Sequence, residues 1–198
     1  LQAPTKYIYT INSTGKKAHA GLEPEKGINA VQQLCGIATM LPSGRLDADS
    51  TGNVGTIKGG EAVNVVPDTA ELRGELRSLD SLSFQRHKSY IDQKVAKANE
   101  SAAGDISISW EQQYEGYRVA ERADCVLLFA NACRSLKRDA VFRKSSVGSD
   151  ANVFNNRELT SIVMGVGMHN VHRFDEYVLC SEIESAGELL RGLLLPPS

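Results

Sequence analysis

Two short stretches of the chain carry residues whose types and spacing could do chemistry. His19 lies among small residues, just before Gly21, on a loop that leads into a predicted helix, so a substrate carbonyl could come close to its imidazole. Such a position suits a hydrogen-bond donor to an oxyanion; the alternative is a surface or interface histidine. The second stretch runs from His169 to Tyr177 and follows an apolar segment. We expect it to lie at the carboxyl end of a strand, where ligands of α/β proteins gather.

The histidines of the second stretch do not by themselves define a metal site. A catalytic zinc usually takes three protein ligands and one open position. The spacing of His169 and His172 is a weak signal, and no H-E-x-x-H motif occurs. The sequence therefore predicts only part of an active site, and we expect the 198-residue chain to bind no zinc tightly.

Four further residues could bind a substrate. Arg77 ends a predicted strand, and its guanidinium is the group best suited to grip a carboxylate with two hydrogen bonds; the alternative is a solvated strand end. Asn64 could act beside it or simply belong to a turn. Gly148 and Ser149 precede a predicted helix start, whose backbone N–H groups could bind a carbonyl or a carboxylate. Ser149 could equally be a plain N-cap.

The composition excludes several classes of partner. A formal net charge of -2 and a pI near 6.1 give no electrostatic case for nucleic acid or for an anionic membrane. The longest apolar stretches are too short to span a bilayer, and the first residues lack the basic and apolar regions of a signal peptide. We therefore expect a soluble protein.

The cysteines indicate a reducing compartment. They are widely spaced and form no C-x-x-C pair, so a zinc knuckle or a thioredoxin-like motif is not expected. Cys35, Cys125 and Cys133 lie in apolar helical runs, where we expect small buried residues with free thiols. These features predict a cytoplasmic protein.

The first part of the chain alternates between strand and helix patterns. Gly59-Gly60 predicts a hairpin turn, and Pro67 is expected to mark a bulge or bend within one long strand. The predicted elements are a strand at 7–11, a helix at 27–41, strands at 54–58 and 63–77, a helix from 78 or 80 to about 103, and a strand at 106–110. The order βαββαβ is that of a ferredoxin-like two-layer module filling residues 1 to about 114.

The second part has a different pattern. It predicts a helix at 123–136, a short strand at 140–142, a buried strand at 159–166 and a closing helix at 183–195. Parallel sheets are buried on both faces and are usually larger than two strands. We therefore expect this part to be one edge of a bigger α/β domain.

Five motifs, in unbroken order over nearly the whole chain, carry a resemblance to a known family. They are His19 with Gly21, Pro24, Gly27, Asn29 and Ala30; Gly59-Gly60 with Asn64-Val65-Val66-Pro67; Gly74-Glu75-Leu76-Arg77-Ser78; Gly148-Ser149-Asp150-Ala151-Asn152; and His172 to Tyr177. Together they resemble the peptidase T-like branch of the co-catalytic zinc metallopeptidases, which also include carboxypeptidase G, aminoacylase and acetylornithine deacetylase.

The resemblance implies an α+β protein with two parts. Residues 1–114 match a ferredoxin-like βαββαβ lid, or dimerisation, domain, and residues 115–198 match the C-terminal portion of the catalytic α/β domain. The implied function is that of the lid and C-terminal part of a di-zinc aminopeptidase, a tripeptidase-like hydrolase and exopeptidase of short peptides. A homodimer through the lid is also implied. The alternative is a catalytically silent dimerisation or binding module.

By the same resemblance, His19 is the lid histidine that polarises the scissile carbonyl, often in the other subunit's site. His172 corresponds to the last zinc ligand. In the family, hydroxide bound to two zinc ions attacks the carbonyl and a glutamate shuttles the proton. That glutamate and the other zinc ligands correspond to segments before the lid, which this sequence does not contain.

The remaining site residues would contact the substrate. The resemblance implies that Asn64 and Arg77 hold its carboxylate end, and that Gly148 and Ser149 belong to the loop beside it.

Two residues depart from the family pattern. Val147 stands where another glycine is usual, which would restrict the loop if that position needs a positive φ. Glu158 stands where a glycine would be the usual helix stop, at a cost of about 1 kcal/mol if the site is left-handed.

Overall fold

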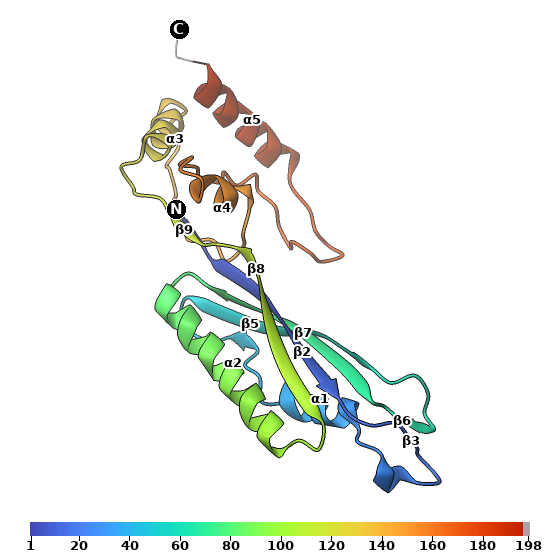
Figure 1. Ribbon diagram of the computed structural model, residues 1–198. Coiled ribbons are helices and arrows are strands. Elements are labelled where there is room, and N and C mark those ends of the chain that lie inside the picture. The colour runs from blue at the N-terminus through green and yellow to red at the C-terminus, as the bar shows by residue number, and fades with distance from the viewer. Residues whose placement is uncertain (196–198) are drawn as a thin grey trace. The chain divides into compact units, whose positions relative to one another are not determined.

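The computed structural model describes residues 1–195 and divides into two compact units (Figure 1). One, called here the sheet unit, is Pro4–Gly116; the other, the helical unit, combines Leu1–Ala3 with the chain from Tyr117 onward. The last three residues of the expected second part, 196–198, lie outside the described residues. Within residues 1–195, no helix is both long enough and apolar enough to cross a bilayer.

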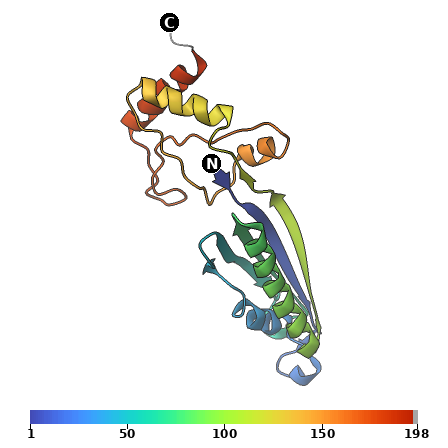
Figure 2. The same cartoon turned by 90° about the vertical axis from the view of Figure 1, so that its left-hand side faces the viewer.

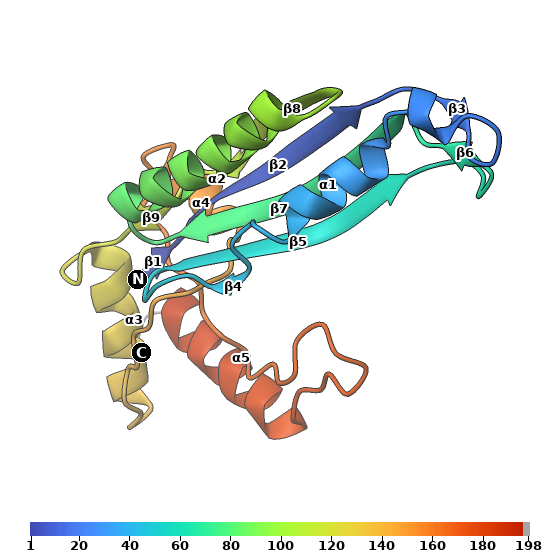
Figure 3. The ribbon, with the colours of Figure 1, turned by 90° about the horizontal axis from the view of Figure 1, so that it is seen from below.

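The sheet unit is a five-stranded antiparallel sheet with two helices on one face, as Figures 2 and 3 show. The strand order is β4-β5-β7-β2-β8. The bounds are β2 Thr5–Thr14, α1 Ala30–Ala38, β4 Gly44–Arg45, β5 Ser50–Gly59, β7 Thr69–Ser78, α2 Ser81–Ser101 and β8 Asp105–Tyr114. The predicted ferredoxin-like order βαββαβ is confirmed, because the four long strands alternate with the two helices in that sequence.

Capping and amphipathic spacing explain both helices. The Asn29 carboxamide accepts a hydrogen bond from the Gln32 N–H at 2.9 Å and starts α1; the Asp80 carboxylate accepts from the Ser83 N–H at 2.7 Å and starts α2. Their apolar faces bury Leu34, Ile37, Ile91 and Val95 against Tyr9, Ile11 and Leu72 of the central strands. The other face of the sheet carries the alternate, mostly polar residues of each strand.

The long predicted strand at 63–77 is two strands. Val65–Val66 forms β6 and pairs with β3, Ala18–His19, in a small separate sheet, whereas β7 begins only at Thr69. Pro67 lies between them because proline has no N–H to donate to a ladder. Likewise, Gly59-Gly60 is not a tight hairpin turn: β5 ends at Gly59, and a loop leads from there to β6.

Up to residue 195, the helical unit contains three helices and one short strand pair. The pair joins β1, Gln2–Ala3, to β9, Tyr117–Arg118. The helices are α3 Asp124–Ser135, α4 Asp150–Asn155 and α5 Cys180–Leu194. The α3 and α5 helices share a small core of Ala132, Cys133 and Leu189. The predicted helices near 123–136 and 183–195 are therefore present.

The predictions of two strands in this unit are wrong. Residues 140–142 and 159–166 belong to no strand, and Val163 is 60% exposed. A β-strand needs a hydrogen-bonding neighbour, and no strand within residues 1–195 pairs with either segment.

The prediction that Cys35 is buried is also wrong: its side chain is exposed. It follows Leu34, which faces the core, and one step along a helix turns the side chain by about 100°. Cys133 is buried as expected, and Cys125 is half-buried.

Candidate functional site

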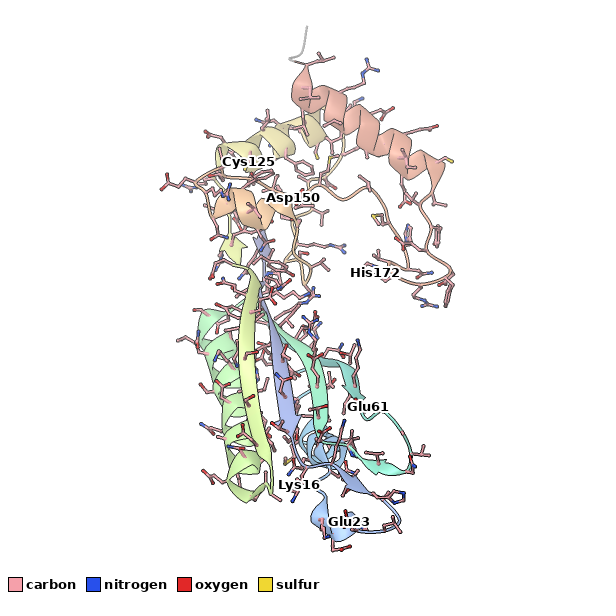
Figure 4. All side chains as sticks on the ribbon, turned by 45° about the vertical axis from the view of Figure 1, so that its right-hand side comes forward. Lys16, Glu23, Glu61, Cys125, Asp150 and His172 are labelled. Carbon is pink, nitrogen blue, oxygen red and sulfur yellow. The ribbon has the colours of Figure 1, made fainter. Side chains whose placement is uncertain are left out.

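The structure brings His19 and Asn64 together at one end of the sheet unit. In the β3–β6 pair His19 lies opposite Val65, and the Ala20 N–H donates to the Asn64 carbonyl oxygen at 2.9 Å. Both residues are exposed. Figure 4 labels Glu23 and Glu61 on the two loops that carry them.

The His19 imidazole is held in one tautomer. Its Nδ1 accepts hydrogen bonds from the backbone N–H groups of Gly21 at 3.1 Å and Leu22 at 3.2 Å. A neutral imidazole has one acceptor and one donor nitrogen, so the proton is assigned to Nε2. The Glu23 N–H donates to the His19 carbonyl at 3.1 Å, which closes the same turn. The loop therefore presents an exposed N–H donor, the group that an oxyanion requires.

The segment 15–28 that carries His19 is closed at its base and held beside β6 and β7. Lys16 and Ile28 exchange two hydrogen bonds of 2.9 Å, and the Gly15 N–H donates to the Asp68 carbonyl at 2.7 Å. A Cβ at Gly27 would lie 2.8 Å from Val66 Cγ1, so β6 can pack this closely only against a glycine. This contact explains the glycine of the first motif.

A charge pair joins this segment to the loop that carries Asn64. Lys17 Nζ lies 3.2 Å from Glu61 and 3.7 Å from Asp68. The hydrogen bond with Glu61, followed by the charge of Asp68, raises the pKa of Lys17. Because these groups are largely exposed, the pair orients the loops more than it stabilises them.

Arg77 is half-buried and engaged by a neighbouring carboxylate. Its Nε and Nη2 donate to the two oxygens of Glu75 at 2.8 and 3.1 Å, and Lys6 Nζ lies 2.9 Å from Glu75 Oε2. Burial pushes the pKa of Glu75 upward, but the hydrogen bonds from Arg77 and Lys6 outweigh it and lower this pKa. Burial likewise acts to lower the pKa of Arg77, and the bond to Glu75 raises it overall. The guanidinium is therefore oriented by a fixed partner.

Within one copy of the chain, Arg77 lies far from Asn64. The β7 strand starts at Thr69, beside β6, and Arg77 is eight residues further along it. At 3.3 Å per residue, Arg77 lies about 26 Å along the strand from Thr69. Asn64 and Arg77 of the same copy therefore cannot grip one carboxylate group.

Ser149 is held by hydrogen bonds at the start of a helix in the helical unit. It is the N-cap of α4, and its backbone N–H donates to Asn152 Oδ1 at 3.0 Å. Burial raises the pKa of Tyr117, and a hydrogen bond with the Ser149 side chain opposes that rise. Gly148, Ser149 and Tyr117 line a cavity of about 470 Å³ together with Phe129. Ser149 thus acts as an N-cap and also borders a space for a ligand.

The two departures from the family pattern have different outcomes. Val147 does not have a positive φ, so its side chain imposes no left-handed strain on the loop. Glu158 does, with φ of 64° just after α4. This is the conformation that glycine adopts more easily.

His172 lies on the loop between the apolar segment and α5 (Figure 4). Its φ is 67°, its imidazole is exposed, and its backbone N–H donates to Glu176 Oε2 at 3.1 Å. Among residues 1–195 there is no group of three His, Cys, Asp or Glu side chains that could hold a metal ion. The described residues therefore do not form a complete zinc site.

Two further contacts between a histidine and a carboxylate were not predicted from the sequence. His169 Nε2 lies 3.1 Å from both carboxylate oxygens of Glu182, and His87 Nε2 lies 2.7 Å from Asp47 Oδ2. Neither pair has a short-range signal, because the partners are 13 and 40 residues apart.

Comparison with known proteins agrees with the fold of the chain. Residues 8–103 match the peptidase dimerisation domain family. Bacillus subtilis YqjE is 30% identical over 98% of this chain and 52% of that protein. Two solved structures are each 26% identical: aminopeptidase PepT from Bacillus cereus, with a TM-score of 0.80 over 97% of this chain and 52% of that one, and a tripeptidase from Staphylococcus aureus, with a TM-score of 0.85 over 97% and 51%.

The predicted resemblance to the peptidase T-like branch is confirmed, and this chain matches a peptidase dimerisation domain. Its dimerisation domain lies within the sheet unit, since the family match covers residues 8–103 and the sheet unit is residues 4–116. The chain spans about half the length of these relatives, 51–52% in each case.

Proposed function

We propose that this chain is the lid and the C-terminal catalytic part of a zinc-dependent aminopeptidase that hydrolyses short peptides such as tripeptides. The sheet unit would be the lid and the helical unit the catalytic part. Similarity to an aminopeptidase and to a tripeptidase supports this substrate class. The protein would act in the cytoplasm.

The observation that carries the proposal is the fixed tautomer of His19. Two backbone N–H groups bind Nδ1, so Nε2–H faces solvent as a donor. During peptide hydrolysis the carbonyl oxygen gains negative charge, and a preorganised N–H donor stabilises it. The neighbouring Asn64 would bind the substrate beside the same carbonyl.

The distance between the two ends of the sheet unit favours a site shared by two copies. Arg77 lies about 26 Å along β7 from Thr69, the residue at the end of the strand nearest to β6 and Asn64. We therefore propose that His19 and Asn64 of one copy act on a substrate whose carboxylate is held by Arg77 of another. A homodimer through the sheet unit would supply this arrangement. Its edge strand β8 pairs only with β2 within residues 1–195 and could pair with a second copy.

Zinc would be held by His172 together with ligands from outside residues 1–195, because the described residues offer no three-ligand group. Gly148 and Ser149 would line the space for the substrate, next to Tyr117.

The competing proposal is a catalytically silent dimerisation or binding module. The same lack of a three-ligand group among residues 1–195 favours it, as does a family match confined to the dimerisation domain. Such a module would keep the lid fold and self-association without hydrolysis.

Assay of the complete source protein separates the two proposals. Hydrolysis of a tripeptide that is lost with a chelator, restored by zinc and abolished by H172A would support the aminopeptidase. A protein that dimerises in sedimentation experiments at high micromolar concentration but neither binds zinc nor cleaves tripeptides would support the silent module. A strictly monomeric protein would contradict the shared site.

A further inference from the structure

Three side chains close the loop that carries His172. His169 and Tyr177 form an antiparallel bridge, with the His169 N–H donating to the Tyr177 carbonyl at 2.9 Å and the Tyr177 N–H donating back at 3.2 Å. Their rings stack with centroids 4.7 Å apart and planes 11° apart. The loop 170–176 is thereby tied at its base by both backbone and side-chain contacts.

Glu182 joins this base to helix α5. Both of its carboxylate oxygens lie 3.1 Å from His169 Nε2, and Oε2 also accepts the Leu179 N–H at 3.2 Å, at the start of the helix. A carboxylate only accepts hydrogen bonds, so the imidazole donates from Nε2. One side chain therefore fixes the loop base and the helix start together.

Gly167 makes room for this carboxylate. Its φ is 82°, and a Cβ there would lie 2.6 Å from both Cβ and Cδ of Glu182. Inside the loop, the Asn170 carboxamide donates to Asp175 at 2.8 Å and the His172 N–H donates to Glu176 at 3.1 Å. Asn170 and His172 both have positive φ, a conformation that persists only when surrounding contacts hold it.

We propose that His169 and Glu182 are positioning residues that hold His172 in place for its ligand before any metal binds. This inference rests on the proposed zinc peptidase. The clasp, defined as His169, Tyr177 and Glu182, would keep the His172 backbone in its left-handed conformation. A ligand held in this way loses less conformational freedom when it binds the metal.

The clasp itself is tested in the 198-residue chain by amide hydrogen exchange. His169→Phe keeps a ring to stack on Tyr177 but removes the bond to Glu182. We expect exchange of the His169 and Tyr177 amides to accelerate about tenfold or more, because hydrogen bonds to charged groups contribute well above a neutral pair. His169→Gln retains an N–H donor and should restore much of the protection. Unchanged exchange in His169→Phe would overturn the clasp.

A matched control lies in the same loop. Arg173 forms an exposed ion pair of 3.0 Å with Asp175, and R173Q should leave the exchange rates unchanged, since such pairs contribute little. Equal acceleration in R173Q and His169→Phe would mean that any change in the loop has this effect, which would also overturn the proposal.

The positioning role is tested by the zinc affinity of the complete source protein in chelator competition. His169→Phe should weaken zinc binding about tenfold or more, with recovery in His169→Gln and no change in R173Q. Wild-type and His169→Phe proteins that bind zinc equally would overturn the positioning role alone. A wild-type protein that binds no zinc would overturn the proposed function and this role together, whatever the exchange rates show.

Discussion

The phenol ring of Tyr9 lies across Gly74 on the neighbouring strand. The two residues are paired in the β2–β7 register, and a Cβ at Gly74 would lie 2.2 Å from both Cζ and Oη of Tyr9. The ring is fully buried, and its hydroxyl donates to the Asn53 carbonyl at 3.3 Å. Burial, followed by the charge of Glu75, raises the pKa of Tyr9 to about 12. The glycine of the Gly74-Glu75-Leu76-Arg77-Ser78 motif is therefore required by packing.

G74A should destabilise the sheet unit by about 1–3 kcal/mol, because the added methyl group displaces the ring. Urea unfolding followed by fluorescence of Trp110 measures this, since the only tryptophan packs 5.2 Å from the Tyr9 ring. G36A is the matched control. A Cβ there has no neighbour within 4 Å, so the substitution should stabilise α1 by about 0.5–1 kcal/mol. Equal effects of the two changes would contradict this account.

E158G should stabilise the end of α4. Glu158 has φ of 64°, and relief of that conformation is expected to gain about 1 kcal/mol, partly offset by the greater freedom of glycine when unfolded. The Leu159 N–H, which donates to the Phe154 carbonyl at 3.0 Å, should then exchange more slowly. R157G places a glycine where φ is not positive and should give no such gain. Slower exchange in R157G than in E158G would disprove the argument.

The stabilising contribution of Asp47 to the sheet unit should be lost in acid. The hydrogen bond with His87 lowers the pKa of Asp47, and a second bond of 3.1 Å comes from Arg86. Its contribution is therefore fully present above the unfolded-state value of about 3.9 and is lost as pH falls through the lower folded-state value.

The measurement is the urea midpoint of the wild type and D47N at pH 6 and at pH 2.5. D47N should be less stable at pH 6, and the difference should shrink in acid. D105N, at the start of the edge strand, should follow the wild type at both pH values. A difference between D47N and the wild type that does not depend on pH would show that the carboxylate charge is not responsible.

His19 and Arg77 should give different kinetic defects in the complete enzyme. H19A should lower kcat on the order of a hundredfold or more, because an oxyanion donor acts mainly in the transition state. R77A should raise KM for peptides with a free carboxylate and change little for amidated peptides. Steady-state kinetics on matched free and amidated tripeptides measure both. The same defect in both mutants would refute the separate roles.

Sequence patterns predicted the helices and strands that pack against one another within the sheet unit. Helical spacing identified α1, β-branched and aromatic residues identified β2, and alternation identified β8. These patterns were sufficient because the residues pack on neighbours within the sheet unit. The division of 63–77 at Pro67 was not predicted, because it depends on the distant pairing of Val65–Val66 with Ala18–His19. The apolar run at 159–166 has strand composition but no pairing partner among the described residues.

The candidate site shows the same limit. The residue types of His19 and Arg77 could be recognised from motifs, but the bonds that orient them could not. The Nδ1 of His19 is bound by the backbone of the two residues at 21 and 22, and Arg77 is bound by Glu75 from the same face of its strand. Both depend on local backbone conformation, which composition does not encode. The bond between His169 and Glu182 in the clasp also depends on the conformation of the chain between these two residues.

The pairing of Ala3 with Tyr117 has a consequence for how such chains can change. Opposed residues on paired strands are about 5 Å apart, so the whole of Pro4–Gly116 enters and leaves the helical unit through two adjacent positions. On the sheet-unit side of this pair, the Gly116 N–H donates to Thr5 Oγ1 at 2.9 Å and holds the same two segments of the chain together. A short linker of two or three residues could replace the sheet unit without separating these ends. A single recombination event could therefore insert the sheet unit into a related protein, delete it or exchange it.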